Sequence, residues 1–218
     1  MKISIGKRAY NIIRLLQKEY PHNKIALKFS DPLELMVSTI LSAQCTDERV
    51  NKVTKILFKK YKSVKDYANA DFKEFQRDIK PTGFYKNKAK NIINASQQII
   101  KRFNKKIPQT MQELTTLPGI GRKTANIILT FAFGKIEGIV VDTHVIRLSK
   151  RLGLSKNNNP AKIEQDLIEI IPKNYWKDFS SLIMEHGRKI CLARRPFCKW
   201  CILKHICPSF KVFSRITN

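Results

Sequence analysis

The most informative stretch of the chain, residues 117–126, reads Leu117-Pro118-Gly119-Ile120-Gly121-Arg122-Lys123-Thr124-Ala125-Asn126. Two glycines spaced by one residue, after a proline and before a helical pattern, predict a tight turn whose backbone N–H groups lie at a helix N-terminus. A short helix, residues 111–116, is expected before the turn, because Thr110 and Glu113 have the spacing of a capping box. The unit is therefore a helix, a glycine hairpin and a second helix. It can hold a phosphate oxygen, and it can equally be an ordinary turn between helices.

A nucleotide-cofactor loop does not fit the spacing of these glycines. A dinucleotide-binding fingerprint needs a preceding strand and a third glycine, and a P-loop needs four residues between its glycines. Gly119 and Gly121 follow a helical segment and are separated by one residue.

Helix start signals recur along the rest of the chain. Asp31-Pro32 and Asn159-Pro160 each offer an N-cap residue and a proline at the first helical position, and Asp71 with Glu74 approximates a capping box. Apolar residues at helical spacing follow these signals, whereas no segment has sustained strand-like alternation bounded by hairpin turns. We therefore predict an all-α fold of roughly nine or ten short helices.

Lys123, near the start of the second helix, and Asp142, further along the chain, are candidate catalytic residues. A lysine amine is a nucleophile only when it is neutral, and partial desolvation near other cations can lower a lysine pKa enough for Schiff-base chemistry on a sugar. A carboxylate from Asp142 would stabilise positive charge that develops on that sugar. Taken alone, the residue types favour ordinary roles: a surface lysine, and the N-cap of a helix running to Leu152.

Four of the five cysteines crowd the C-terminus, while Cys45 stands alone. The C-x6-C-x2-C-x5-C array consists of Cys191, Cys198, Cys201 and Cys207. Two disulfides are the minority interpretation in a reducing compartment, so a metal site is favoured. The wide outer gaps favour an iron-sulfur cluster over zinc, which usually takes two close cysteine pairs; in the zinc alternative, His205 would be a substitute ligand.

The segment that carries these cysteines is basic. Between Arg188 and Lys211 it holds seven Lys and Arg residues and no acidic residue. Positive charge around a metal site is typical of a loop that contacts phosphates, with Arg194 and Arg195 as the candidate contacts, and a merely solvated loop is the alternative.

Composition supports a polyanionic partner. The 218 residues include 42 Lys and Arg against 17 Asp and Glu, a formal charge of +25, so nucleic acid is the first hypothesis and an anionic membrane surface the second. A hydrophobic fraction of 43% is too high for a disordered basic tail. The longest nearly apolar run, from Ile127 to Phe133, is too short for a membrane span, and no secretory signal pattern follows Met1. We expect a cytoplasmic protein with reduced cysteines.

Several of these segments, in this order, resemble the endonuclease III family of helix-hairpin-helix DNA glycosylases. The resemblance extends from about Pro32 to Cys207 and is carried by Leu41–Asp47 (LSAQCTD), Leu117–Asn126 (LPGIGRKTAN), Val141–His144 (VDTH), and His186-Gly187-Arg188 before the four cysteines. It implies a bilobal fold, in which residues 25–135 form a six-helix domain and residues 1–24 and 136–218 form a cluster domain, with DNA bound in the cleft between them. It also implies a 4Fe-4S cluster on the four clustered cysteines.

By the same resemblance, Lys123 is the nucleophile and Asp142 the catalytic carboxylate. A damaged base must be flipped out of the duplex, and Gln44 matches the residue that fills the gap. Phe84 lies at the wedge position, where leucine is more usual, and an aromatic ring can still intercalate. The other residues expected at the DNA are Gly119, Gly121, Arg122, Thr143, His144, Arg194 and Arg195.

The expected activity is that of a bifunctional DNA glycosylase and AP lyase, acting as a monomer on double-stranded DNA with oxidised pyrimidines or abasic sites. Within the superfamily, the rivals are a mismatch thymine or uracil glycosylase and an enzyme that excises adenine opposite oxidised guanine; the latter typically has an additional C-terminal domain, for which this chain has no room. From another class, the rival is a non-catalytic, structure-specific DNA-binding protein.

Overall fold

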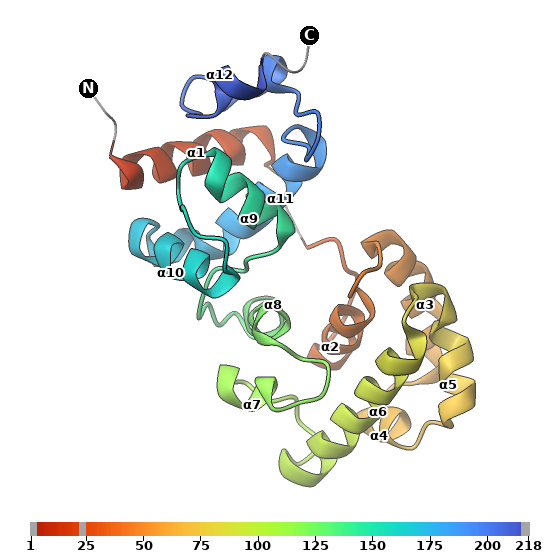
Figure 1. The fold of residues 1–218 in the computed structure, drawn as a ribbon. Coiled ribbons are helices and arrows are strands. Elements are labelled where there is room, and N and C mark those ends of the chain that lie inside the picture. Colours follow the sequence, from red (N-terminus) through yellow and green to blue (C-terminus); the bar gives the residue numbers. More distant parts are fainter. Residues whose placement is uncertain (1–3, 22–24, 215–218) are drawn as a thin grey trace. The chain divides into compact units, whose positions relative to one another are not determined.

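The computed structural model describes residues 4–21 and 25–214, and the regular structure within them is entirely helical (Figure 1). The elements in chain order are α1 (Ile5–Glu19), α2 (Pro32–Leu41), α3 (Asp47–Lys60), α4 (Val64–Ala68), α5 (Phe72–Ile79), η1 (Lys80–Thr82), α6 (Tyr85–Arg102), α7 (Met111–Thr115), α8 (Arg122–Ala132), α9 (Thr143–Arg151), α10 (Pro160–Ile170), η2 (Lys173–Tyr175), α11 (Trp176–Lys189), η3 (Cys198–Trp200) and α12 (Phe210–Phe213), where η marks a 3-10 helix. The predicted all-α fold is confirmed. These residues contain twelve α-helices rather than nine or ten, because helices as short as α4 and α12 leave no periodicity in the sequence. Across the same residues, no helix has both the length and the apolar character needed to cross a membrane.

Local capping chemistry explains where several helices begin. The Asp31 carboxylate accepts a hydrogen bond from the backbone N–H of Glu34 at 2.9 Å, and Asp71 accepts one from Glu74 at 2.8 Å. The side chain of Asn159 accepts from the N–H of Ala161 at 2.9 Å. These bonds satisfy N–H groups that have no partner within their own helix, so the predicted starts of α2, α5 and α10 are confirmed.

The chain divides into two compact units. The terminal unit consists of Met1–Lys24 and Gly138–Asn218, and the central unit is Ile25–Glu137. Each unit has its own hydrophobic core.

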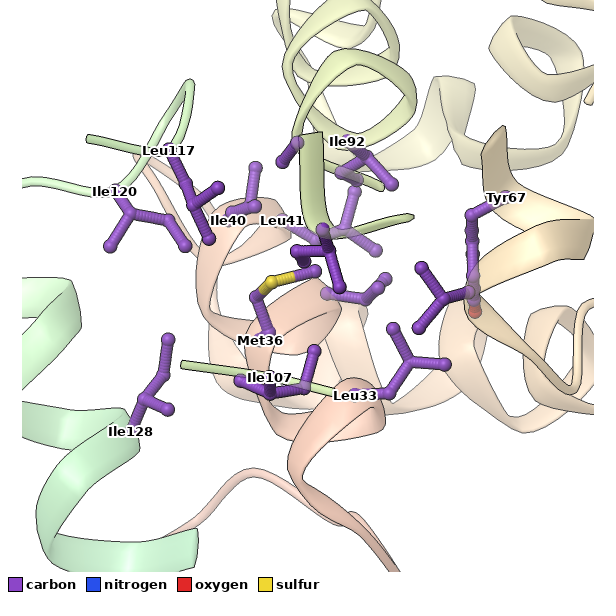
Figure 2. Close-up of a cluster of buried hydrophobic side chains, with 14 of the residues drawn as sticks. Leu33, Met36, Ile40, Leu41, Tyr67, Ile92, Ile107, Leu117, Ile120 and Ile128 are labelled. Atoms are coloured by element: carbon purple, nitrogen blue, oxygen red, sulfur yellow. The ribbon is translucent and has the colours of Figure 1, made fainter. Parts of the chain in front are cut away.

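Helix α2 is at the centre of the core of the central unit. Eight of its ten residues are buried, and it packs against α3, α6 and α8. Figure 2 shows side chains of α2, among them Met36 and Ile40, in one cluster with Ile92 of α6, Ile128 of α8, and Ile107 from the segment between α6 and α7. A helix that is buried on nearly all sides is stable only inside such a layer of other helices.

The core of the terminal unit joins the N-terminal helix to helices from the other end of the chain. Ile12, Ile13 and Leu16 of α1 are fully buried and belong to one cluster with Leu148 of α9 and Phe179 of α11. The α1 helix packs directly on α10 and α11. Burial of its apolar stripe therefore depends on residues about 150 positions away in the sequence.

Candidate active site and cysteine loop

The hairpin after α7 is a hydrogen-bonded turn that places the N-terminus of α8. The N–H of Ile120 donates to the carbonyl of Leu117 at 3.1 Å, and the intervening Gly119 has a φ of 80°. Proline and glycine at the two central positions are typical of a type II turn, which needs a positive φ at the second. The expected helix, hairpin and helix are thus present at residues 111–132.

The two glycines of the hairpin are needed for different reasons. A residue with a side chain at position 119 would have to adopt a left-handed backbone conformation. Its Cβ atom would also lie 2.9 Å from the Cβ of Asn91 on α6. Gly121, the N-cap of α8, has an ordinary φ of −88°, and apart from its two chain neighbours no described residue has an atom within 4 Å of the place where its Cβ would be. Backbone conformation and packing therefore account for Gly119 but not for Gly121, whose surface is open to close approach by a ligand.

Lys123 is the second residue of α8, within its first turn, and its side chain is exposed, as is that of Arg122. Helix α8 begins without a side-chain cap, as α6 and α11 also do, whereas Asp31, Thr46 and Thr110 each cap their own helix. An uncapped helix N-terminus next to two cationic side chains attracts anions.

Asp142 lies in the terminal unit, as the N-cap of α9. Its Oδ1 atom accepts a hydrogen bond from the N–H of Val145 at 2.8 Å, which confirms the predicted cap. The side chain is only partly buried, and the next residue, Thr143, is exposed. The cap fixes the carboxylate at the N-terminus of α9, where a negative charge is favoured.

His144 and Arg147 bind the last turn of α11. The Nη2 atom of Arg147 donates to the carbonyls of Gly187 and Cys191 at 2.9 and 3.0 Å, and it lies 3.1 Å from Nδ1 of His144. Burial lowers the pKa of His144; Asp142 opposes that shift and Arg147 adds to it. Gly187 is required by this packing, because a Cβ there would lie 2.8 Å from Nδ1 of His144. Gly187 in the sequence His186-Gly187-Arg188 therefore allows α9 and α11 to pack closely.

The cysteine loop, residues 191–207, surrounds a cavity. All four of its cysteines line that cavity, together with Leu148 and Arg151 of α9 and His186 of α11. Arg151 donates through Nη1 to Sγ of Cys191 at 3.3 Å and to the carbonyl of Leu192 at 2.7 Å. Its Nη2 atom donates to the carbonyl of Ala193 at 2.7 Å. Burial raises the pKa of Cys201 to about 12 and raises the pKa values of Cys198 and Cys207 as well.

The donor set of this loop is four thiols, which is the chemistry of a metal centre. Within residues 4–21 and 25–214, no three His, Cys, Asp or Glu side chains are placed to hold a single metal ion. The four sulfurs nevertheless line one cavity, as they would if each bound a different iron of a cluster. His205 is exposed and does not line the cavity, so the zinc alternative with this residue loses its support. Arg194 and Arg195 are both exposed on the loop.

Gln44 and Phe84 lie in the central unit, each just after the end of a helix. Both have left-handed backbone conformations, with φ values of 52° and 48°, although neither is glycine. Both side chains are exposed, and that of Phe84 is 62% exposed. Non-glycine residues rarely adopt this conformation, and where they do it is often at a functional site.

Sequence reasoning missed Arg147 and Arg151, which hold the backbone around the cysteine loop. Their signal was present: His144, Arg147 and Arg151 follow one another at spacings of three and four, so they share one face of α9. Arginines at the apolar side of a helix indicate partners elsewhere in the fold, but the sequence does not identify those partners.

Comparison with known proteins agrees with these features. The family model for HhH-GPD superfamily base excision DNA repair proteins matches residues 37–173. Endonuclease III of Synechocystis sp. is 51% identical over 203 residues, which is 93% of each chain. A solved non-covalent complex of endonuclease III with DNA is 39% identical, with a TM-score of 0.92 over 98% of this chain and 100% of that one. A trapped covalent intermediate of endonuclease III with DNA, an estranged-adenine complex, is 38% identical, with a TM-score of 0.91 over 99% of this chain and 100% of that one. Similarity of this extent and length shows that the protein belongs to the endonuclease III family, within the HhH-GPD superfamily of base excision DNA repair proteins.

Proposed function

We propose that this protein is a bifunctional DNA glycosylase and AP lyase of base excision repair. The observation that carries the proposal is the exposed amine of Lys123 in the first turn of α8. The hairpin before it leaves the backbone of Gly121 open, and the N-terminus of α8 has no side-chain cap, so a phosphate can bind there. The relative that was trapped as a covalent intermediate with DNA supports an amine nucleophile, because a lysine Schiff base is such an intermediate.

The reaction begins with the neutral amine of Lys123. Its lone pair forms a bond to C1′ of the damaged nucleotide while the bond from C1′ to the base breaks and the base leaves with the electron pair. The departing base takes up one proton from the attached amine. The C1′–O4′ bond of the sugar ring then breaks as the nitrogen lone pair forms the C1′=N bond, and O4′ takes up a proton from water, giving a protonated Schiff base between Nζ and C1′. Loss of a proton from C2′ and cleavage of the C3′–O bond then release the 3′ strand by β-elimination, and water hydrolyses the Schiff base to free the lysine.

Two groups help this chemistry. The carboxylate of Asp142 stabilises the positive charge on the sugar as the base leaves, and the N-cap bond through Oδ1 fixes its orientation. Arg122, the other cation in the first turn of α8, would hold the DNA backbone beside the exposed amine of Lys123.

Binding begins with the phosphates. The N–H groups at the hairpin, reached past the bare backbone of Gly121, take one phosphate, while Arg194 and Arg195 take others. Thr143 and His144, beside Asp142, contact the extruded nucleotide. Gln44 fills the gap left in the duplex and Phe84 intercalates next to it, because a base can react only after it has been flipped out.

The cysteine loop holds a 4Fe-4S cluster in this proposal. The ligands are Cys191, Cys198, Cys201 and Cys207. Bound iron would supply the positive charge that keeps these buried sulfurs as thiolates, and the cluster would tie the loop into a fixed shape. Arg151 orients the loop by holding the carbonyls of Leu192 and Ala193.

Oxidised pyrimidines in duplex DNA are the proposed substrates, and the protein acts as a monomer in the cytoplasm, where a bacterial chromosome lies. A panel of duplexes that carry single lesions, including thymine and uracil mismatches, separates this specificity from the rival glycosylases. A non-catalytic DNA-binding protein would bind an abasic duplex with steep salt dependence and leave it intact.

Borohydride trapping tests the chemistry directly. Borohydride reduces a Schiff base to a stable amine, so the wild-type protein should become covalently attached to abasic duplex DNA. Lys123→Ala should abolish the adduct, and Lys123→Arg is the matched control, because it keeps the charge but has no comparable nucleophile. No adduct with the wild-type protein, or an undiminished adduct with Lys123→Arg, would refute the proposal.

A further inference from the structure

A lysine is buried in the core of the central unit. Lys88, on α6, is only 3% exposed, although lysine is almost never buried without a partner. Its Nζ atom donates one hydrogen bond to the carbonyl of Leu41 at 2.7 Å and another to the carbonyl of Thr82 at 2.8 Å. The two carbonyl oxygens are therefore no more than two hydrogen-bond lengths apart.

Both acceptors are the last residues of helices. Helix α2 ends at Leu41 and the 3-10 helix η1 ends at Thr82. Carbonyl groups at a helix C-terminus have no partner within the helix, and at the end of α2 the helix dipole adds partial negative charge. The ammonium group of Lys88 satisfies both needs at once, and in doing so it ties two helix ends together.

The residues after these two helix ends are the ones assigned above to the gap in the duplex. Gln44 follows Leu41 by three residues, and Phe84 follows Thr82 by two. Both are left-handed and both side chains are exposed. A strained conformation persists only where the surrounding structure holds it, and Lys88 contacts the base of each loop.

We propose that Lys88 is a positioning residue for base extrusion, which holds the loops carrying Gln44 and Phe84 at a fixed separation so that both side chains enter the duplex together. This inference rests on the proposed function, because it assigns Lys88 a part in that reaction. An apolar side chain would fill the same space without the penalty of burying a charge, so the presence of a cation favours a role beyond packing. Burial lowers the pKa of Lys88, and the nearby Cys45 opposes that shift.

The test uses three variants of the full-length protein. Lys88→Met keeps an unbranched apolar stem as far as Cε but removes the ammonium donors. Lys88→Arg restores a cation with several donors and serves as the rescue. Lys90→Met is the matched control, because it removes one charge from an exposed position on the same helix and so reports the general loss of phosphate affinity.

Two substrates separate positioning from general damage to the enzyme. The first substrate is duplex DNA with an abasic site, in which the base opposite the site has no partner and a gap in the stack must be filled. The second is the same abasic strand alone, in which no gap has to be filled. Single-turnover rates of strand cleavage are measured on both. In parallel, 2-aminopurine is placed opposite an uncleavable abasic analogue in a duplex saturated with protein, and its fluorescence reports unstacking.

Lys88→Met should slow cleavage of the duplex by about tenfold or more, a magnitude of the order expected for a misplaced site residue. It should slow cleavage of the single strand by less than about threefold, and it should remove most of the fluorescence increase. Lys88→Arg should recover duplex cleavage to within about threefold, and Lys90→Met should keep the wild-type ratio between the substrates. If Lys88→Met does not fold by circular dichroism, Lys88→Gln carries the same comparison, since its amide is shorter and reaches fewer carbonyls.

Equal slowing on both substrates, or an unchanged fluorescence increase, would overturn the role of Lys88. Absence of duplex cleavage by the wild-type protein would instead count against the proposed function, so the two failures are distinguishable.

Discussion

Alanine at each glycine of the hairpin should separate a structural effect from a binding effect. In Gly119→Ala, the new methyl group must sit at a φ of 80° and 2.9 Å from the Cβ of Asn91. The left-handed conformation costs about 1–2 kcal/mol for an L-residue, and forcing an extra carbon into a packed site costs about 1–3 kcal/mol. After the gain of about 0.4–1 kcal/mol from a less flexible unfolded chain, we expect a net loss of about 1–5 kcal/mol.

Gly121→Ala should behave in the opposite way. Its φ of −88° suits alanine, and no described atom lies within 4 Å of the added methyl group, so stability should change by less than about 1 kcal/mol. If a phosphate approaches this backbone, the methyl group blocks it. A hydrogen bond to a charged group contributes about 1.5–3 kcal/mol, so affinity for duplex DNA should fall by about 10- to 150-fold.

The assays are urea unfolding followed by circular dichroism, and fluorescence anisotropy with a duplex that contains an abasic analogue at one fixed salt concentration. We expect Gly119→Ala to lose mainly stability and Gly121→Ala to lose mainly DNA affinity, at temperatures where both variants are folded. Wild-type stability in Gly119→Ala would refute the steric argument. Wild-type affinity in Gly121→Ala would refute the phosphate contact at the hairpin.

Two further substitutions test the terminal unit. Asp142→Asn should leave the free energy of unfolding within about 0.5 kcal/mol of wild type, because asparagine caps a helix as well as aspartate does. It should slow base excision roughly 100-fold or more, because the negative charge is lost. Wild-type activity of this variant in a single-turnover assay would show that Asp142 is only a cap. Arg151→Met should lower the iron content of the purified protein and destabilise it by about 2–4 kcal/mol, since three acceptors near Cys191 lose a charged donor. The exposed neighbour Lys150→Met is the control, and iron content equal to that control would contradict the role of Arg151.

Several local features were predictable because the interactions behind them act over three or four residues. Asp31 and Asn159 cap their helices through N–H groups within the first turn, and the Pro118-Gly119 pair forms its turn with a bond from Ile120 to Leu117. The N-cap role of Asp142 follows the same rule. The number of helices was underestimated, since a helix of one turn, such as α12, has no period to detect.

Sequence reasoning could place Lys88 on the buried face of α6, because Lys88, Ile92 and Ile99 recur at helical spacing. The same pattern would normally indicate a lysine that reaches out to water along its apolar stem. Arg147 and Arg151 present the same ambiguity, since their acceptors lie about 40 residues further along the chain.

Residue types and their spacing thus determine the helices, the hairpin and the identity of the chemical groups, because capping, turn formation and helical periodicity are short-range. The contacts of the buried Lys88 ammonium with two helix ends, in contrast, depend on long-range packing. One of its acceptors, Leu41, is 47 residues away, and the contact exists only because α2, η1 and α6 pack together in one core. The packed fold brings the carbonyls of Leu41 and Thr82 to one amine, because a buried charge must find its partners wherever the surrounding helices end.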